Sequence, residues 1–312
     1  MKLEECERSP SHVLTRRGIV AGLLASGVVS GLPLPALATI TTDTKGLTAG
    51  DVKIPAGKLT IRGYRAMPAR GGPFSCVIVI HEIYGLSEHV KDLCRRFAKA
   101  GYFAVAPNLF AREGDPTQSL EKLRAVQASV RDDQVMSDLD ATAAWAKHTG
   151  KADVSRLGVV GFGWGGRIAW LYAAHDPAPR ASVAWYGHLE RPATPQEPRH
   201  PLDVVSELKA PVLGLYGDAD GGIPVGDVET MRAALKAAGK EAEIVVYPNA
   251  HHAFNGDDRE YNYQPEAAQA AWQRMLAWLS EHGITSQVSA AVAGTANPTG
   301  ASPARMRAHI DW

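Results

Sequence analysis

The chain of 312 residues has few cysteines and no excess of either charge. Its three cysteines, Cys6, Cys76 and Cys94, do not make a disulfide framework. Lys plus Arg and Asp plus Glu both number 33, so net charge gives no reason to expect nucleic acid or a membrane surface as a partner. The 11 histidines lack the spacing typical of zinc sites. We therefore expect no metal, no cofactor and no nucleic acid.

What the chain does contain is enough apolar sequence for a large core. Hydrophobic residues make up 45% of it, and one folded domain of about 240 residues is expected. There is no internal repeat and no linker that would divide this domain. A small-molecule substrate is the expected partner, with the protein as a monomer or a small homo-oligomer.

The N-terminal segment is typical of an export signal. Arg16 and Arg17 precede a mildly apolar, glycine-containing run, and Ala36-Leu37-Ala38 has the small residues of a cleavage site. This pattern predicts a twin-arginine signal over residues 1–38, cleaved near Ala38, and a periplasmic or secreted protein with no membrane contact after cleavage. An uncleaved anchor is the alternative, although the prolines and glycines of the segment make a poor spanning helix.

The opposite end, residues 285–312, is rich in Ala, Ser, Gly and Pro and lacks periodicity. Such composition predicts a disordered tail. The folded domain is therefore expected over residues 45–284.

Within this domain short apolar runs alternate with amphipathic stretches of helical length. The expected strands are 74–83, 102–110, 156–163, 181–187, 210–218 and 241–250, and the expected helices are 87–101, about 120–148, 164–175, 225–239 and 265–283. Alternation of this kind predicts an α/β fold: a doubly wound, mostly parallel sheet with helices on both faces. Residues 58–68 are expected to add an antiparallel edge.

Three of the expected strands end in residues suited to catalysis. The strand over 156–163 runs through a Gly-x-Gly-x-Gly sequence directly into a helix, as in a nucleophile elbow. The next two such strands end in Asp218-Ala219-Asp220 and in His251-His252. The order nucleophile, acid, histidine is that of an α/β hydrolase. However, the nucleophile position is occupied by Gly163, which has no side chain that could attack a substrate.

Several separated motifs resemble the dienelactone hydrolase family over nearly all of residues 45–284. They are the stretch from His81 to Asp115, the elbow GFGWGGR, the acid loop GDADGGIP and the histidine loop YPNAHHAF. The resemblance implies that Asp220 is the triad acid, that His252 is the triad histidine and that Gly163 replaces a cysteine.

The same resemblance assigns further residues by position. Glu82 corresponds to the glutamate that restrains and deprotonates the resting thiol, and the backbone N–H groups of Ile83 and Trp164 correspond to the oxyanion hole. Arg112 corresponds to an arginine that holds the substrate carboxylate, and Tyr84 is also expected to bind substrate. A second such arginine is not found directly after the histidine loop, which reads HHAFNGDD.

Other interpretations of these residues stay open at this stage. His252 has the alternative of a core histidine, Asp218 competes with Asp220, and Arg112 has the alternative of a surface charge. Glu82 needs a polar partner if it is buried. His81-Glu82 is followed by Gly85 rather than histidine, so it does not form the zinc motif H-E-x-x-H.

The sequence therefore predicts a hydrolase of small esters or lactones, or a descendant of one. Gly163 has three explanations: a recent loss of the nucleophile, a pseudoenzyme that binds a small acyl or carboxylate ligand, or a hydrolase that uses water directly.

Overall fold

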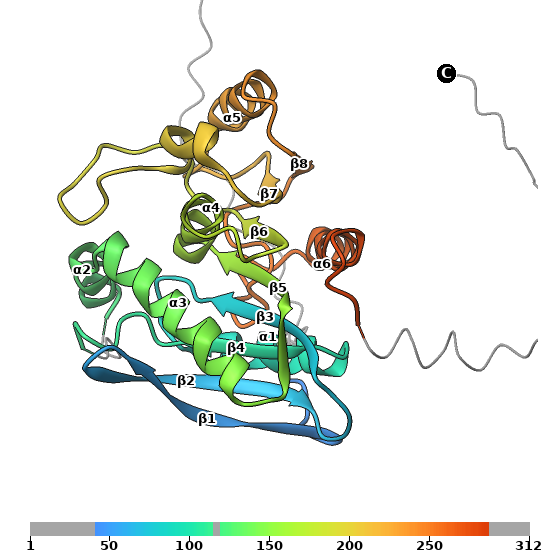
Figure 1. Cartoon of the computed structure of the whole chain (residues 1–312). Helices are drawn as coiled ribbons and strands as arrows, with labels where there is room; N and C mark the ends of the chain where they lie inside the picture. Colours follow the sequence, from blue (N-terminus) through green and yellow to red (C-terminus); the bar gives the residue numbers. More distant parts are fainter. Residues whose placement is uncertain (1–40, 115–118, 287–312) are drawn as a thin grey trace, which may run out of the picture. The chain divides into compact units, whose positions relative to one another are not determined.

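The computed structural model describes residues 41–114 and 119–286 (Figure 1). The predicted signal over residues 1–38 and the predicted tail beyond Ser286 lie outside these residues. No helix in the described ranges is both long and apolar enough to cross a membrane.

The described residues contain eight strands, and from β3 onward one or two helices follow each strand. The strands are β1 (Leu47–Ala56), β2 (Leu59–Pro68), β3 (Phe74–Ile80), β4 (Phe103–Pro107), β5 (Ala152–Phe162), β6 (Ala181–Trp185), β7 (Val212–Gly217) and β8 (Ala242–Tyr247). The helices are α1 (Glu88–Lys99), α2 (Leu120–Ser129), α3 (Asp132–His148), α4 (Trp164–His175), α5 (Val225–Ala237) and α6 (Pro265–Glu281), with a 3₁₀ helix η1 (Pro201–Glu207).

The strands form one sheet in the order β1-β2-β4-β3-β5-β6-β7-β8. The pairs β1–β2 and β2–β4 are antiparallel, whereas all other neighbouring strands run parallel. This confirms the predicted doubly wound, mostly parallel sheet with an antiparallel edge. Every residue of β3 is buried, as expected of a strand covered on both faces.

Helices cover both faces of the sheet (Figure 1). On one face α1 packs against α6, where the rings of Phe97 and Trp272 are 4.9 Å apart. On the other face α3 lies beside α4.

The helix α1 is capped as predicted, because the Ser87 hydroxyl accepts a hydrogen bond from Val90 N–H and the helix ends just before Gly101.

The region predicted as one helix over about 120–148 is instead two helices. The backbone of Val130 and Arg131 is extended, which ends α2 and begins α3. Neither residue is a glycine or proline, so the sequence contains no local signal for the break. Val130 is buried, and Asp132 N–H donates a hydrogen bond to the carbonyl of Gln196 in the β6–η1 segment (residues 186–200). Tertiary contacts therefore accompany this break.

The winding of the sheet determines where a ligand site can form. From β3 the chain moves to β4 on one side, whereas β5 lies on the other side of β3. The loops that leave the carboxyl ends of β3 and β5 therefore diverge, and such a switch point is where open α/β sheets bind ligands. These two loops contain Glu82, Ile83 and Gly163.

Candidate active site

The turn between β5 and α4 has the backbone of a nucleophile elbow. Gly163 is its central residue, with φ 55° and ψ −115°, an unusual conformation that glycine adopts readily. A Cβ at Gly161 would lie 1.8 Å from the carbonyl oxygen of Gly165, so the chain can turn this tightly only with glycine at position 161. The first glycine of the Gly-x-Gly-x-Gly sequence is therefore required because a side chain there would clash with the backbone of Gly165.

Position 163 itself has room for a side chain. A Cβ built there would be 3.8 Å from Cγ of Glu82, an ordinary van der Waals separation. The absence of a nucleophile is therefore a property of the sequence and is not imposed by crowding.

Asp220 and His252 are paired at the ends of β7 and β8. The Nδ1 atom of His252 donates to Oδ2 of Asp220 across 2.8 Å, while Oδ1 accepts from the N–H groups of Gly222 and Ile223. Burial alone would raise the pKa of Asp220, but the bond from His252 and those from the backbone hold it below its usual value. The carboxylate therefore stays ionised and fixes the orientation of the imidazole.

The geometry distinguishes this pair from its neighbours. Asp218 accepts a hydrogen bond from Asn249 N–H at 2.6 Å. His251 is exposed and its Nδ1 lies 3.3 Å from the carbonyl oxygen of Ala219. Both residues therefore stabilise the loops. Among these four residues, Asp220 and His252 are the two that form an acid–histidine pair.

The backbone N–H groups of Ile83 and Trp164 are candidates for an oxyanion hole. Neither donates to a loop or turn carbonyl within the described ranges. Trp164 is the first residue of α4, where a helix has no internal acceptor for its N–H groups. Both residues line the same cavity as Gly163 and His252. Such donors can stabilise a developing negative charge.

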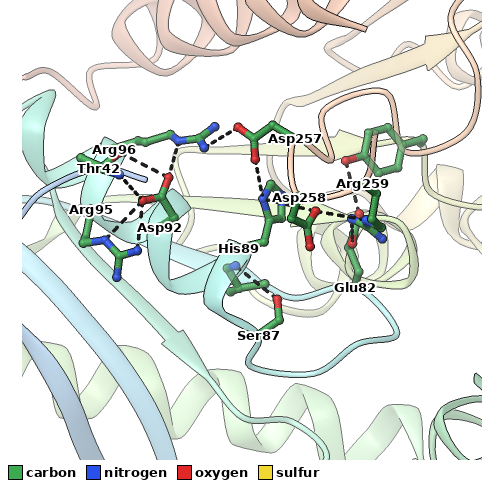
Figure 2. A network of polar contacts seen from close by, with 12 residues as sticks. Thr42, Glu82, Ser87, His89, Asp92, Arg95, Arg96, Asp257, Asp258 and Arg259 are labelled. Carbon is green, nitrogen blue, oxygen red and sulfur yellow. Dashed lines mark hydrogen bonds and ion pairs between the residues drawn. The ribbon is translucent and has the colours of Figure 1, made fainter. Parts of the chain in front are cut away.

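Glu82 is buried beside position 163 and has two polar partners. One carboxylate oxygen accepts from the Tyr186 hydroxyl at 3.4 Å, and the other forms an ion pair with Arg259. Figure 2 shows Glu82 at the end of a chain of polar contacts that continues through Arg259 and Asp258 toward His89. The predicted need for a polar partner is met by this ion pair.

His81 supports the loop that contains Glu82. Its Nδ1 donates to the carbonyl oxygen of Glu82 at 2.7 Å, and its Nε2 accepts from Leu109 N–H at 3.0 Å. Burial lowers its pKa to about 4. The ring is therefore neutral, with both nitrogens used to position the backbone.

A cavity of about 500 Å³ joins these groups. It is lined by Glu82, Ile83, Tyr84, Arg124, Gln127, Ala128, Gly163, Trp164, Arg167, His188, Arg191, Glu197, His252, Ala253, Arg259 and Asn262. Seven of the eight predicted site residues are therefore either in this lining or, for Asp220, bonded to a residue of it. Tyr84 lies at the cavity with its ring 4.6 Å from the Arg259 guanidinium.

Arg112 is the exception among the predicted site residues. Its guanidinium donates through two nitrogens to the carboxylate of Asp138 in α3, and it does not line the cavity. Because Asp138 is buried, this pairing gives Arg112 a structural role.

Four other arginines line the cavity and were missed by sequence reasoning. They are Arg124, Arg167, Arg191 and Arg259. Arg259 is only seven residues after His252, just beyond the sequence HHAFNGDD, in which no second arginine was found. A search extended by one residue beyond this sequence would have found Arg259. The others lie in segments without a recognisable motif.

Comparison with known proteins agrees with this geometry. Residues 61–283 match the dienelactone hydrolase family. A protein of Methylorubrum extorquens named "Putative carboxymethylenebutenolidase" is 53% identical over 275 residues, which cover 87% of this chain and 94% of that protein. A protein of the same name from Escherichia coli K12 is 47% identical over 248 residues, 78% of this chain and 91% of its own length.

A solved structure gives the same result in three dimensions. The crystal structure of a "Putative Dienelactone Hydrolase" from Klebsiella pneumoniae is 50% identical, with a TM-score of 0.73, and the similarity covers 75% of this chain and 98% of that one. The family match covers most of the chain, and the fold agrees with it. The chain is therefore a member of the dienelactone hydrolase family of α/β hydrolases.

Proposed function

We propose that this protein hydrolyses small ester or lactone substrates with water as the direct nucleophile. The observation that carries the proposal is the intact Asp220–His252 pair, 2.8 Å apart, whose histidine lines the same cavity as Gly163. Family membership and the names of the relatives, which denote lactone hydrolases, support the substrate class.

The reaction follows from the groups around the cavity. The oxygen of a water molecule attacks the substrate carbonyl carbon, while Nε2 of His252 accepts a proton from that water. The carbonyl oxygen becomes an oxyanion, to which the N–H groups of Ile83 and Trp164 donate. The protonated His252 then returns the proton to the leaving alkoxide as the acyl–oxygen bond breaks. Asp220 stabilises the imidazolium throughout.

The rate expected of such a site is low. A serine protease without its nucleophile retains about 10³- to 10⁴-fold acceleration over water, because oxyanion stabilisation and substrate binding persist. We expect turnover in this range on activated esters and strained lactones.

Gly163 favours a second candidate function, a binding protein for a small acyl or carboxylate ligand. No side chain at position 163 can form an acyl-enzyme, and the cavity keeps its polar lining. This candidate predicts saturable binding without turnover.

The two candidates are separated by assays on p-nitrophenyl acetate and dihydrocoumarin. His252→Ala is expected to remove the turnover, whereas His251→Ala, a change at the exposed neighbour, is expected to retain it. If the parent and His252→Ala hydrolyse both compounds at the same rate, water activation by His252 is refuted. Calorimetric binding of the hydrolysis products without any turnover would favour the binding protein.

A further inference from the structure

The side-chain position of Gly163 is open. A Cβ built there would lie 3.8 Å from Cγ and 3.9 Å from Cβ of Glu82, and no other described heavy atom beyond the chain neighbours is within 4 Å. Gly163 also lines the cavity of about 500 Å³. A small molecule in the cavity can therefore lie directly against the elbow.

The polar groups around this position have unused hydrogen-bonding capacity. Nδ1 of His252 is bonded to Asp220, and within the described ranges Nε2 of the same ring has no hydrogen-bond partner. The N–H groups of Ile83 and Trp164 donate to no loop or turn carbonyl among the described residues. The site therefore offers a free base and two free donors to whatever enters the cavity.

His252 is connected to the open position through two buried side chains. The ring of Tyr186 packs edge-on against the His252 ring, with centroids 5.5 Å apart. The Tyr186 hydroxyl donates to Glu82 at 3.4 Å, and Glu82 is the side chain nearest to position 163. The base and the open position thus border one compact space.

The charges beside Gly163 suit an attacking thiolate. The helix α4 begins at Trp164, and a helix N-terminus carries partial positive charge. Arg259 forms an ion pair with Glu82 (Figure 2), so this carboxylate repels an anion less than an unpaired one would. A thiol, with a pKa of about 8.5, gives its proton to imidazole far more readily than water, with a pKa of about 15.7.

The described chain has no thiol of its own in the cavity. Cys76 in β3 and Cys94 in α1 are both free and buried, and neither lines the cavity. A sulfur nucleophile at this site would therefore have to come from a second molecule.

We propose that this protein transfers the acyl group of its ester or lactone substrate to a small thiol that lies against Gly163, as a second activity beside hydrolysis. The sulfur forms a bond to the carbonyl carbon while Nε2 of His252 accepts the thiol proton. The acyl–oxygen bond then breaks and His252 returns the proton to the leaving alkoxide. The products are a thioester and an alcohol, and no oxidant or reductant is needed. This inference rests on the proposed function, because both reactions use His252 and the same oxyanion donors.

The test supplies the protein with dihydrocoumarin and either methanethiol or 2-methylpropane-2-thiol, and mass spectrometry measures the thioester and the acid. Methanethiol at about 10 mM is expected to raise the enzyme-dependent consumption of the lactone at least about tenfold, because a thiolate is a stronger nucleophile than water. This rate is expected to saturate with thiol concentration, whereas the uncatalysed reaction stays linear.

The branched thiol tests whether the reaction takes place in the confined space beside Glu82. Each enzymatic rate is divided by the uncatalysed rate of the same thiol. This ratio is expected to be at least about tenfold lower for 2-methylpropane-2-thiol, because its extra methyl groups hold the sulfur away from the attacking position. Equal ratios for the two thiols would overturn the proposal.

Variants locate the reaction at position 163. Gly163→Ala is expected to lower the thioester-to-acid ratio about tenfold, because its methyl group takes room that a thiol needs more than water does. Gly226→Ala, in α5 and outside the cavity lining, is the matched control and is expected to keep the parent ratio. An unchanged ratio in a folded Gly163→Ala protein would refute the assignment.

The two products separate this inference from the proposed function. Acid without thioester would refute thiol transfer and leave hydrolysis standing. Thioester without acid would support thiol transfer and refute direct attack by water. Neither product above the uncatalysed level would refute both.

Discussion

At position 163 the backbone has the geometry of a nucleophilic residue but no side chain. The φ of 55° is one that an L-residue adopts at a cost of about 1–3 kcal/mol, which a reactive residue at this position would have to overcome. Glycine avoids most of this cost. The protein with glycine at position 163 is therefore expected to be more stable, and less reactive, than a variant with a nucleophilic residue there.

Gly163→Cys is expected to raise kcat/KM on p-nitrophenyl acetate by at least about 100-fold, because a thiolate replaces water as nucleophile. The new Cβ fits, since Glu82 lies 3.8 Å away. A helix N-terminus and a nearby histidine both lower a thiol pKa. Steady-state kinetics of the parent and the variant provide the measurement.

Two controls make this result interpretable. Gly163→Cys combined with His252→Ala tests whether the new thiol uses the histidine. Cys76 and Cys94 are free and buried, and burial raises the pKa of Cys76 to about 12, so neither is expected to react with iodoacetamide at the rate of a thiol in the cavity. A folded Gly163→Cys variant no faster than the parent would mean that the site has lost its catalytic geometry.

The elements that surround the site depend on glycine for close approach. A Cβ at Gly161 would overlap the backbone of Gly165 at the start of α4. Any larger residue at position 161 must therefore push β5 and α4 apart.

Gly161→Ala is accordingly expected to destabilise the protein by about 3 kcal/mol or more, as overpacking and backbone displacement combine. Gly226→Ala, in α5, is the matched control, because no described atom other than those of its chain neighbours and its own helix backbone lies within 4 Å of its added Cβ. That change is expected to be neutral or slightly stabilising. Urea unfolding of both variants measures the difference, and equal stabilities would contradict the steric explanation of the elbow.

Most of the elements could be predicted because each has a local signal. The buried strand β3 is a continuous apolar run, and α1 has a serine cap and a glycine stop. The break between α2 and α3 could not be predicted, because Val130 and Arg131 have no intrinsic preference that ends a helix. The 3₁₀ helix η1 was not predicted, although Pro201 is its first residue and the Asp203 side chain accepts a hydrogen bond from His200 N–H at its start.

The site was predictable to the extent that strand ends converge at one edge of a parallel sheet. This rule brought Gly163, Asp220 and His252 together from segments far apart in the chain, whereas Glu82 was assigned by the family resemblance. The ion pairs of Arg112 and Arg259 could not be derived, because sequence spacing gives no information on which carboxylate a long side chain reaches. Arg112 pairs with Asp138, and Arg259 reaches Glu82 across 177 residues.

Across the whole molecule, charged groups connect the N-terminal part of the described chain to the site. Asp92 accepts from Thr42 and from Arg96, Arg96 pairs with Asp257, and Asp257 accepts from His89 (Figure 2). Burial would raise the pKa of Asp257, but the bond from His89 and the charge of Arg96 hold it below its ordinary value of 3.8.

The lowered pKa of Asp257 predicts how stability depends on pH. The unfolded chain takes up a proton at this carboxyl at a higher pH than the folded chain, so the stabilisation is complete above the ordinary pKa of 3.8. It is lost as pH falls through the lower pKa of the folded state. Asp220 contributes with the same sign. We therefore expect Tm to fall as the pH is lowered below about 4.

Asp257→Asn tests this contribution by scanning calorimetry between pH 7 and pH 3. The variant is expected to lose about 3 kcal/mol at pH 7, because Arg96 loses a buried partner, and to show a smaller further decline in acid. Glu260→Gln, an exposed position in the same loop, serves as control. A variant whose Tm declines in parallel with the parent would show that Asp257 does not contribute to the acid limb.

The steric freedom at Gly163 has a consequence for how this protein evolves. Gly161 has no role in catalysis, yet the tight turn requires glycine there. A Cβ built at position 163, by contrast, has no backbone atom within 4 Å other than those of its chain neighbours. Exchange between glycine and a small reactive side chain therefore needs no change in the surrounding packing, although the positive φ makes glycine the more stable residue. Selection for folding cannot preserve the catalytic residue, and only selection for turnover can. A lineage that stops needing the reaction would drift to glycine first, and one further substitution would restore the lost group on an unaltered scaffold.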